Sequence, residues 1–167
     1  RGRSDADHYG RGDPVVASAS DNFDRANGQI GANWAEDTGD WEVNTNVAVQ
    51  RTNTSTFFKT RYTATPPDTN DYYSEAAVVS VIGAAQGTGL CVRAASGANT
   101  FYSYVYYGSD NSYLSEITAG VESILDTGDA VTGATSYTAR LQASGSALTG
   151  TRNAAADVSA TDGTLTT

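Results

Sequence analysis

From Val15 onward, short apolar segments alternate with clusters of Gly, Asn, Asp and Ser, and helix-forming residues never run long enough to sustain a helix. Segments of this length and spacing are typical of strands in a sandwich or barrel. The pattern therefore predicts an all-β chain with two packed antiparallel sheets. The predicted strands are 15–20, 41–43, 47–51, 56–63, 72–82, 89–94, 100–107, 112–117, 136–143, 146–152 and 155–160.

Three short segments between these strands are predicted to be hairpin turns. Residues 95–99, 108–111 and 143–146 supply Gly, Asn, Asp or Ser, which tolerate positive φ. Segment 121–125 (VESIL) fits either a strand or one helical turn, because periodicity over five residues does not separate the two.

Alternation along a strand predicts which side chains face the core. We expect 76–82, which is almost continuously apolar, to form a central strand and the most buried segment. In 101–107 (FYSYVYY), Tyr102, Tyr104 and Tyr106 share one face, and both faces are partly apolar. In 137–142, the expected inward residues are Tyr137, Ala139 and Leu141, and the expected outward residues are Thr138, Arg140 and Gln142.

Length and charge limit the number of domains and the classes of partner. The chain has 167 residues, enough for one domain with a core, and a formal charge of −9. One Lys and nine scattered Arg argue against a nucleic-acid partner, and no window is apolar enough to predict a membrane span. Cys91 is predicted to be a small buried hydrophobe. Residues 1–14 are polar, end at Pro14 and are expected to form an extended N-terminal arm.

The block 21–34 (DNFDRANGQIGANW), followed by 39–43 (GDWEV), resembles the opening of concanavalin A-like, laminin-G-like jelly-roll domains, which occur in bacteriophage structural proteins and secreted bacterial proteins. Looser similarity continues through 89–94, 137–148 and 162–167. The resemblance implies a jelly-roll β-sandwich over 15–167. Such domains usually end with a closing strand, so we expect either that the sequence is incomplete after Thr167 or that a neighbour's arm fills the gap by strand addition.

Within the opening block, Arg25 is predicted to form a charge-assisted clasp with Asp21 or Asp24 that fixes the loop on the sheet. We expect this clasp to be mainly a folding device. The aromatic residues of the block are expected to be core or lid residues: Phe23, Trp34 and Trp41.

The sequence offers no catalytic pair. Retaining glycosidases need two carboxyl groups about 5 Å apart. Glu116 and Glu122 are six residues apart, and the adjacent Glu36 and Asp37 would face opposite sides of a strand. The single His, His8, lies in the predicted arm, so a base for nucleophilic catalysis is missing from the predicted domain. We predict no catalytic residues and a chain that is not an enzyme.

Acidic loops at 37/40, 68/71 and 126/129 are compatible with a structural Ca²⁺. None of them has the spacing of an EF-hand, so solvated acidic turns are the favoured interpretation. We assign no metal ligands and no cofactor.

The tyrosine stripe is the most suggestive binding feature. Tyr102, Tyr104 and Tyr106, joined by Tyr72, Tyr73 or Tyr113, could form a platform for sugar rings, with Arg140 and Gln142 as hydrogen-bonding neighbours. The alternative is that the stripe packs between the sheets or against a partner subunit, as Tyr favours sites with one dry and one wet end. An open tyrosine face would favour glycan binding, and a covered one would favour assembly.

These observations lead to a non-catalytic structural or attachment module of a virion or other extracellular assembly, such as a capsid decoration, fibre or tail protein. It would act through contacts with other protein subunits, at the virion surface or outside the cell. The alternative is a glycan-binding, lectin-like module, and a third hypothesis is a degenerate glycan hydrolase. The virion assignment rests on the resemblance and not on a site.

Overall fold

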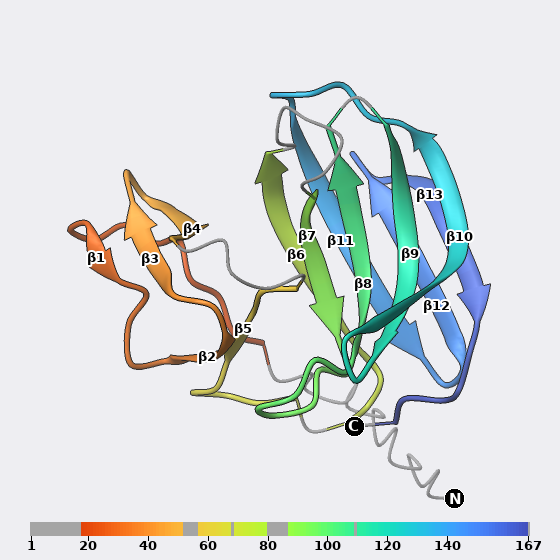
Figure 1. Ribbon diagram of the computed structural model, residues 1–167, viewed down its shortest axis with the longest axis horizontal. Helices are drawn as coiled ribbons and strands as arrows, with labels where there is room; N and C mark the ends of the chain where they lie inside the picture. The colour runs from red at the N-terminus through yellow and green to blue at the C-terminus, as the bar shows by residue number, and fades with distance from the viewer. Residues whose placement is uncertain (1–17, 52–56, 68, 80–86, 109, 167) are drawn as a thin grey trace, which may run out of the picture.

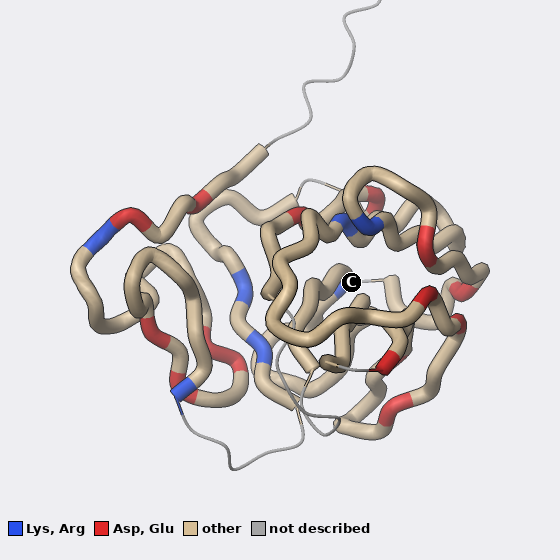
Figure 2. The backbone as a smooth tube through the Cα atoms, turned by 90° about the horizontal axis from the view of Figure 1, so that it is seen from above, with Lys and Arg blue, Asp and Glu red and all other residues tan. Residues whose placement is uncertain are grey.

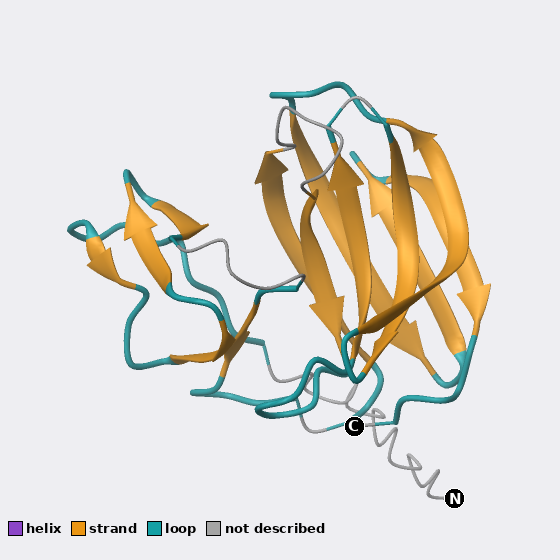
Figure 3. Cartoon of the chain, in the orientation of Figure 1, coloured by secondary structure: helices purple, strands orange, loops and turns teal. Residues whose placement is uncertain are grey.

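The computed structural model describes residues 18–51, 57–67, 69–79, 87–108 and 110–166. The described residues form strands and loops and contain no helix (Figure 3). Among these ranges, therefore, no helix could span a membrane. The predicted arm (1–14), His8 and residues 80–82 of a predicted strand lie outside the described residues. Residues 18–20 are described and are not a strand, so the first predicted strand is wrong in that part.

Two four-stranded antiparallel sheets stack face to face and make an all-β jelly-roll β-sandwich (Figure 1). One sheet has the order β10-β9-β8-β7, formed by β7 (Gly87–Val92), β8 (Phe101–Tyr107), β9 (Asn111–Thr118) and β10 (Val121–Ala130). The other has the order β13-β12-β11-β6, formed by β6 (Tyr72–Val79), β11 (Ser136–Ser144), β12 (Ala147–Arg152) and β13 (Ala155–Thr161).

A smaller N-terminal part lies beside the sandwich, on the side of β6 and β7 (Figure 1). It holds a three-stranded sheet, β1-β3-β4, and a two-stranded sheet, β2-β5. Its strands are β1 (Gly28–Gln29), β2 (Trp34–Thr38), β3 (Trp41–Asn44), β4 (Val47–Gln50) and β5 (Lys59–Tyr62). The sequence pattern did not predict β1 or β2, because both are short and β2 (WAEDT) is largely polar.

The core between the two large sheets follows the predicted alternation in β11. Ala139 and Leu141 are fully buried, Thr138 is exposed, and the half-buried Tyr137 packs against the core. Arg140 and Gln142 lie on the other face of the sheet and are half-buried. The predicted inward and outward faces of this strand are therefore confirmed. The core cluster consists of Val78, Val92, Tyr102, Tyr104, Tyr106, Leu114, Val131, Ala139, Leu141, Ala143, Leu148 and Val158.

The prediction for 76–82 is wrong over its described part. β6 pairs only with β11 among the described strands, so it is an edge strand, and Ala76, Ala77 and Val79 are exposed. Val78 alone in this run is buried. An apolar run indicates a strand but does not show whether that strand has one neighbour or two.

The three predicted turns do join antiparallel neighbours: β7 with β8, β8 with β9, and β11 with β12. Gly97 and Gly145 adopt φ of 63° and 55° in the first and third turns, a conformation that glycine enters without steric cost. Segment 121–125 is a strand, and it belongs to the longer β10.

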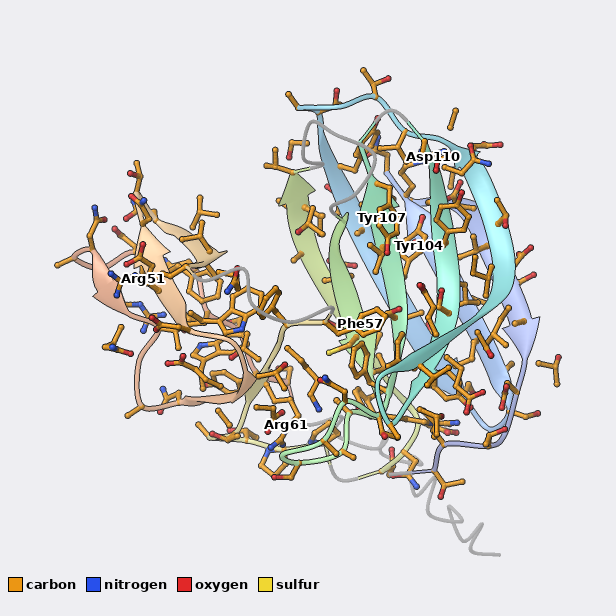
Figure 4. The ribbon with its side chains drawn as sticks, viewed as in Figure 1. Arg51, Phe57, Arg61, Tyr104, Tyr107 and Asp110 are labelled. Atoms are coloured by element: carbon orange, nitrogen blue, oxygen red, sulfur yellow. The ribbon has the colours of Figure 1, made fainter. Side chains whose placement is uncertain are left out.

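Three charged side chains join the small part to the sandwich. Asp37 of β2 pairs with Lys59 and Arg61 of β5, and its Oδ1 also accepts the backbone N–H of Gly97 at 2.9 Å. Lys59 Nζ donates to the carbonyl of Ala98 at 2.8 Å, within the β7–β8 turn. Figure 4 shows Phe57 and Arg61 at this junction, and Phe57 meets Phe101 edge to face, with ring centroids 6.4 Å apart. The junction is therefore both ionic and aromatic.

Candidate functional site

The predicted tyrosine platform is closed. Tyr102, Tyr104 and Tyr106 have no exposed surface, because their face of β8 is covered by the opposite sheet (Figure 4 labels Tyr104). The rings of Tyr104 and Tyr106 pack on each other with centroids 5.0 Å apart, and the ring of Tyr106 packs on that of Tyr137. The structure therefore corrects the glycan-stacking role given to these three residues: sugar rings cannot reach them. By the criterion of the sequence analysis, this covered face favours assembly.

Two of the buried tyrosines bind carboxylates. Tyr102 donates its hydroxyl proton to Asp162 Oδ1 at 2.8 Å, and Tyr104 donates to Asp157 Oδ2 at 2.5 Å. Burial raises the pKa of both tyrosines, and the hydrogen bonds to the carboxylates raise it further. They are structural side chains that stay protonated.

Arg140, the fourth predicted binding residue, lies instead on the outer face of the same sandwich, on β11. Its guanidinium carbon sits 3.7 Å from the ring centroid of Tyr73 on the neighbouring β6. Arg140 Nη2 donates to Gln142 Oε1 at 3.2 Å, and Nη1 lies 4.0 Å from a carboxylate oxygen of Glu75. We call Tyr73, Glu75, Arg140 and Gln142 the Tyr73 surface. The Tyr73 surface brings the predicted site residue Arg140 together with Tyr73 and Gln142, which the sequence analysis suggested as further members of the glycan platform.

The backbone register explains why these side chains meet. Tyr73 pairs with Gln142 and Glu75 pairs with Arg140, and directly paired residues project from the same face of a sheet. The opposite face of both strands faces the core, so the four polar side chains point to solvent. Tyr73 retains 48% of its surface exposed even with Arg140 stacked on it.

The Tyr73 surface continues across the sheet as a polar row. Gln142 pairs with Thr149 of β12, which pairs with Ser159 of β13, and both of these residues are exposed. Adjacent strands are about 4.8 Å apart, so the row from Tyr73 to Ser159 spans about 14 Å. It is a flat face on rigid strands and not a pocket.

The predicted clasp forms in the small part. Arg25 pairs with Asp21, and Trp34 Nε1 donates to Asp21 Oδ2 at 2.8 Å. Phe23 packs on Trp34 with ring centroids 5.4 Å apart, and its backbone N–H donates to Asp21 Oδ1 at 2.8 Å. Trp41, the remaining aromatic residue predicted with the opening block, takes part in none of these hydrogen bonds or ring contacts.

Trp41 has separate partners, which keep it near the junction between β2 and β3. Its indole N–H donates to the carbonyl of Thr38 at 3.0 Å, and its backbone N–H donates to Glu36 Oε2 at 2.8 Å. The side chain is half-buried and belongs to the small part, as a lid or core residue would.

Several structural residues were missed by sequence reasoning. Lys59 is buried at the junction, which is an unusual place for a lysine. The one sequence signal that could have identified it is that it is the single Lys of the chain. Arg93 is also buried, and its guanidinium donates to the carbonyls of Asn70, Gly145 and Leu165. Arg93 entered the sequence analysis only as the arginine of the loose resemblance over 89–94, and its burial was not predicted, because its hydrogen-bond partners are remote in the chain.

The carboxylates singled out for catalysis do not form a pair. Glu122 pairs across strands with Ile117 and accepts from Ser115 at 2.8 Å, whereas Glu116 alternates with Ile117 and lies on the opposite face of β9. Glu116 accepts instead from Thr118. Cys91 is half-buried, and desolvation raises the pKa of its thiol to about 11, so it is a poor nucleophile.

The acidic loops have other partners. Asp37 pairs with Lys59 and Arg61, and Asp126 Oδ2 accepts the backbone N–H of Ser159 at 2.7 Å. Within the described ranges, no three His, Cys, Asp or Glu side chains group closely enough to hold a metal ion. Basic positions are few and scattered among more numerous acidic ones (Figure 2).

Neither a protein-family model nor a curated protein matches this sequence. Among solved structures, the chain is similar to the carbohydrate binding module CBM66 from Bacillus subtilis, with a TM-score of 0.59 over 80% of this chain and 82% of that chain. The two sequences are 14% identical, so the likeness shows the fold alone. It supports the sandwich expected from the resemblance, and the bacteriophage origin stays a prediction.

Proposed function

We propose that this chain is a non-catalytic carbohydrate-binding module and that its Tyr73 surface holds an extended glycan against the outer face of the β6-β11-β12-β13 sheet. The observation that carries the proposal is the half-exposed ring of Tyr73 with the Arg140 guanidinium stacked on it. A non-catalytic role also agrees with the structural likeness to a module that binds carbohydrate.

The chemistry of the surface suits sugar rings. Tyr offers an apolar ring and a polar tip, which match the C–H face and the hydroxyl groups of a sugar. Arg140 has five N–H donors, and its Nη2 donates to Gln142 Oε1. The carboxylate of Glu75 is a hydrogen-bond acceptor. Arg140 and Glu75 carry opposite charges 4.0 Å apart, so the surface is locally neutral and favours a neutral glycan.

The flat, extended shape of the Tyr73 surface favours an internal stretch of a glycan chain. The row from Tyr73 through Gln142 and Thr149 to Ser159 crosses four strands, about 14 Å, and offers hydroxyl or amide groups at each step after the aromatic ring. Because these groups stand on paired strands, little backbone ordering accompanies binding.

A glycan array with the wild-type protein, followed by calorimetry on the best neutral polysaccharide, tests the proposal. Tyr73→Ala and Arg140→Ala should each weaken binding at least tenfold, about 1.4 kcal/mol. Tyr73→Phe should retain most of the affinity, because the ring remains. Ile124→Ala is the matched control, since this exposed side chain lies on β10 of the other sheet. An array without neutral-glycan hits, or equal affinity for Tyr73→Ala, would contradict the proposal.

A structural or attachment module of a virion or extracellular assembly is the second candidate. Two observations favour it: the tyrosine face of β8 is covered, and Val121 and Ile124 of the edge strand β10 expose 69% and 57% of their surface. Exposed apolar side chains on an edge strand are suited to contact with another subunit. Native mass spectrometry decides here: a discrete oligomer that Ile124→Glu dissociates supports assembly, and a monomer at all concentrations speaks against it.

A further inference from the structure

A second candidate site lies in the small part, away from the Tyr73 surface. It begins with a strained turn at 21–25. Phe23 adopts φ of 54°, which is uncommon for a bulky residue, and its carbonyl accepts the N–H of Arg25 at 2.8 Å. Strained backbone of this kind persists only where its surroundings hold it, and it clusters at ligand sites.

Asp21 holds this turn. One oxygen accepts the backbone N–H of Phe23, and the other accepts from Arg25 and the indole of Trp34. Gly31 makes room for the arginine, because a Cβ at this position would stand 2.8 Å from Arg25 Nη1. The Arg25 side chain is therefore fixed beside the turn.

The facing wall comes from the end of the β2-β5 ladder. Trp34 pairs with Tyr62, and their rings meet edge to face with centroids 5.3 Å apart. The carbonyl of the preceding Asn33 accepts both the N–H and the hydroxyl of Thr63, at 2.7 and 3.1 Å. The backbone that carries the side chains of Asn33 and Tyr62 is thus held by paired strands and hydrogen bonds.

Turn and ladder together border an open cavity of about 500 Å³, lined by Ser20, Asp21, Asn22, Arg25, Asn33 and Tyr62, of which Ser20, Asn22 and Asn33 are exposed. This volume lies within the range of small-molecule sites, about 300–1,000 Å³. Its lining combines two amides, two hydroxyls and one aromatic ring. The charges of Arg25 and Asp21 are paired with each other, so neither is left to select an ionic ligand.

We propose that this cavity binds a neutral polyhydroxylated ring, one or two sugar units at the end of a glycan, as a site independent of the Tyr73 surface. Asn33 provides a planar amide that donates and accepts hydrogen bonds with neighbouring hydroxyls, and Asn22 provides the two N–H donors of its amide, whose Oδ1 accepts the backbone N–H of Asp24 at 3.0 Å. Tyr62 provides an apolar ring edge and a hydroxyl. A concave site of this size takes the end of a chain, whereas the flat Tyr73 surface takes its middle.

Saturation-transfer NMR and calorimetry with neutral hexoses and their disaccharides test the proposal, with a uronic acid as the charged comparison. The wild-type protein should bind at least one neutral sugar. Asn33→Ala should weaken that binding at least tenfold, and Asn22→Ala should weaken it too, which gives a second readout if one variant folds poorly. Asn27→Ala is the matched control, because Asn27 lies in the same small part but bonds to Asn44 and Thr45 outside the cavity.

Tyr73→Ala should leave binding of the short sugar unchanged, so this proposal and the proposed function can fail separately. Absence of binding to every neutral mono- and disaccharide, preference for the uronic acid, or unchanged affinity in both Asn33→Ala and Asn22→Ala would each overturn it. Circular dichroism on every variant establishes that the fold is retained.

Discussion

The Lys59 amino group lies 3.3 Å from a carboxylate oxygen of Asp37, and both side chains are almost completely buried, with 1% and 4% exposure. The pair comes from two neighbouring strands of the small part, while Lys59 also donates to a carbonyl of the β7–β8 turn. It therefore connects the small part to the sandwich, and removing Asp37 leaves the buried charge of Lys59 uncompensated.

Asp37→Ala is expected to lower the free energy of unfolding by about 3–5 kcal/mol, because Lys59 then stays buried without its counter-charge. Urea denaturation followed by tryptophan fluorescence measures the change. Arg51→Ala serves as the control, since its ion pair with Glu42 is half exposed and should contribute about 0–1 kcal/mol. A loss below about 1 kcal/mol for Asp37→Ala would show that the pair does not hold the junction.

Acid should destabilise the fold. Burial raises the pKa of the Asp37 and Asp157 carboxyls, but hydrogen bonds outweigh it: Arg61 and the Gly97 amide act on Asp37, and Ser112 and Tyr104 act on Asp157. Each folded pKa thus lies below the unfolded value of about 3.9, so the stabilisation is complete above that value and is lost as pH falls through the folded pKa. Thermal midpoints should decline below about pH 4.

The matched variant for this prediction is Asp37→Asn, which removes one titrating group and should flatten the decline. A midpoint that stays level or rises as the pH falls through this window would contradict the assigned shifts.

Tyr104→Phe should destabilise the protein by about 1–3 kcal/mol, because the buried carboxylate of Asp157 loses a hydrogen-bond donor. Ser103→Ala, on the same strand, is the comparison. The Ser103 hydroxyl is buried and finds no hydrogen-bond partner among the described residues, so its removal should cost little or stabilise. Equal losses in the two variants, measured by chemical denaturation, would argue against a role for the Tyr104–Asp157 bond.

Arg93→Lys should also reduce stability, by about 1–3 kcal/mol. The guanidinium reaches three carbonyls at once, those of Asn70, Gly145 and Leu165, through a rigid fork that an ammonium group cannot reproduce. Differential scanning calorimetry provides the measurement. A lysine variant that melts like the wild type would show that the three contacts contribute little.

The fold was predictable from local patterns where those patterns are strong. β11 alternates cleanly between apolar and polar residues, and its inward and outward faces are as predicted. β6 shows the limit: its apolar run marks a strand, but the number of neighbours depends on pairings made elsewhere in the chain. β2 was missed because Trp34–Thr38 is stabilised by pairing with β5, not by its own composition.

The candidate site was predictable only in part. Both faces of β8 carry apolar or aromatic residues, so the sequence could not show that Tyr102, Tyr104 and Tyr106 face inward. Arg140 was correctly placed on an outer face, whereas its stacking on Tyr73 depends on the register between β6 and β11. The cavity beside Asp21 likewise needs Tyr62, which is distant in sequence from the opening block.

Mapping of glycan contacts by NMR tests the central claim most directly. When a neutral polysaccharide selected on the array is added to the labelled protein, amide shifts are predicted at 73–75 and 140–142 and, more weakly, at Thr149 and Ser159. Perturbations confined to β8, β9 and β10, or no perturbation with any neutral glycan, would contradict binding at the Tyr73 surface.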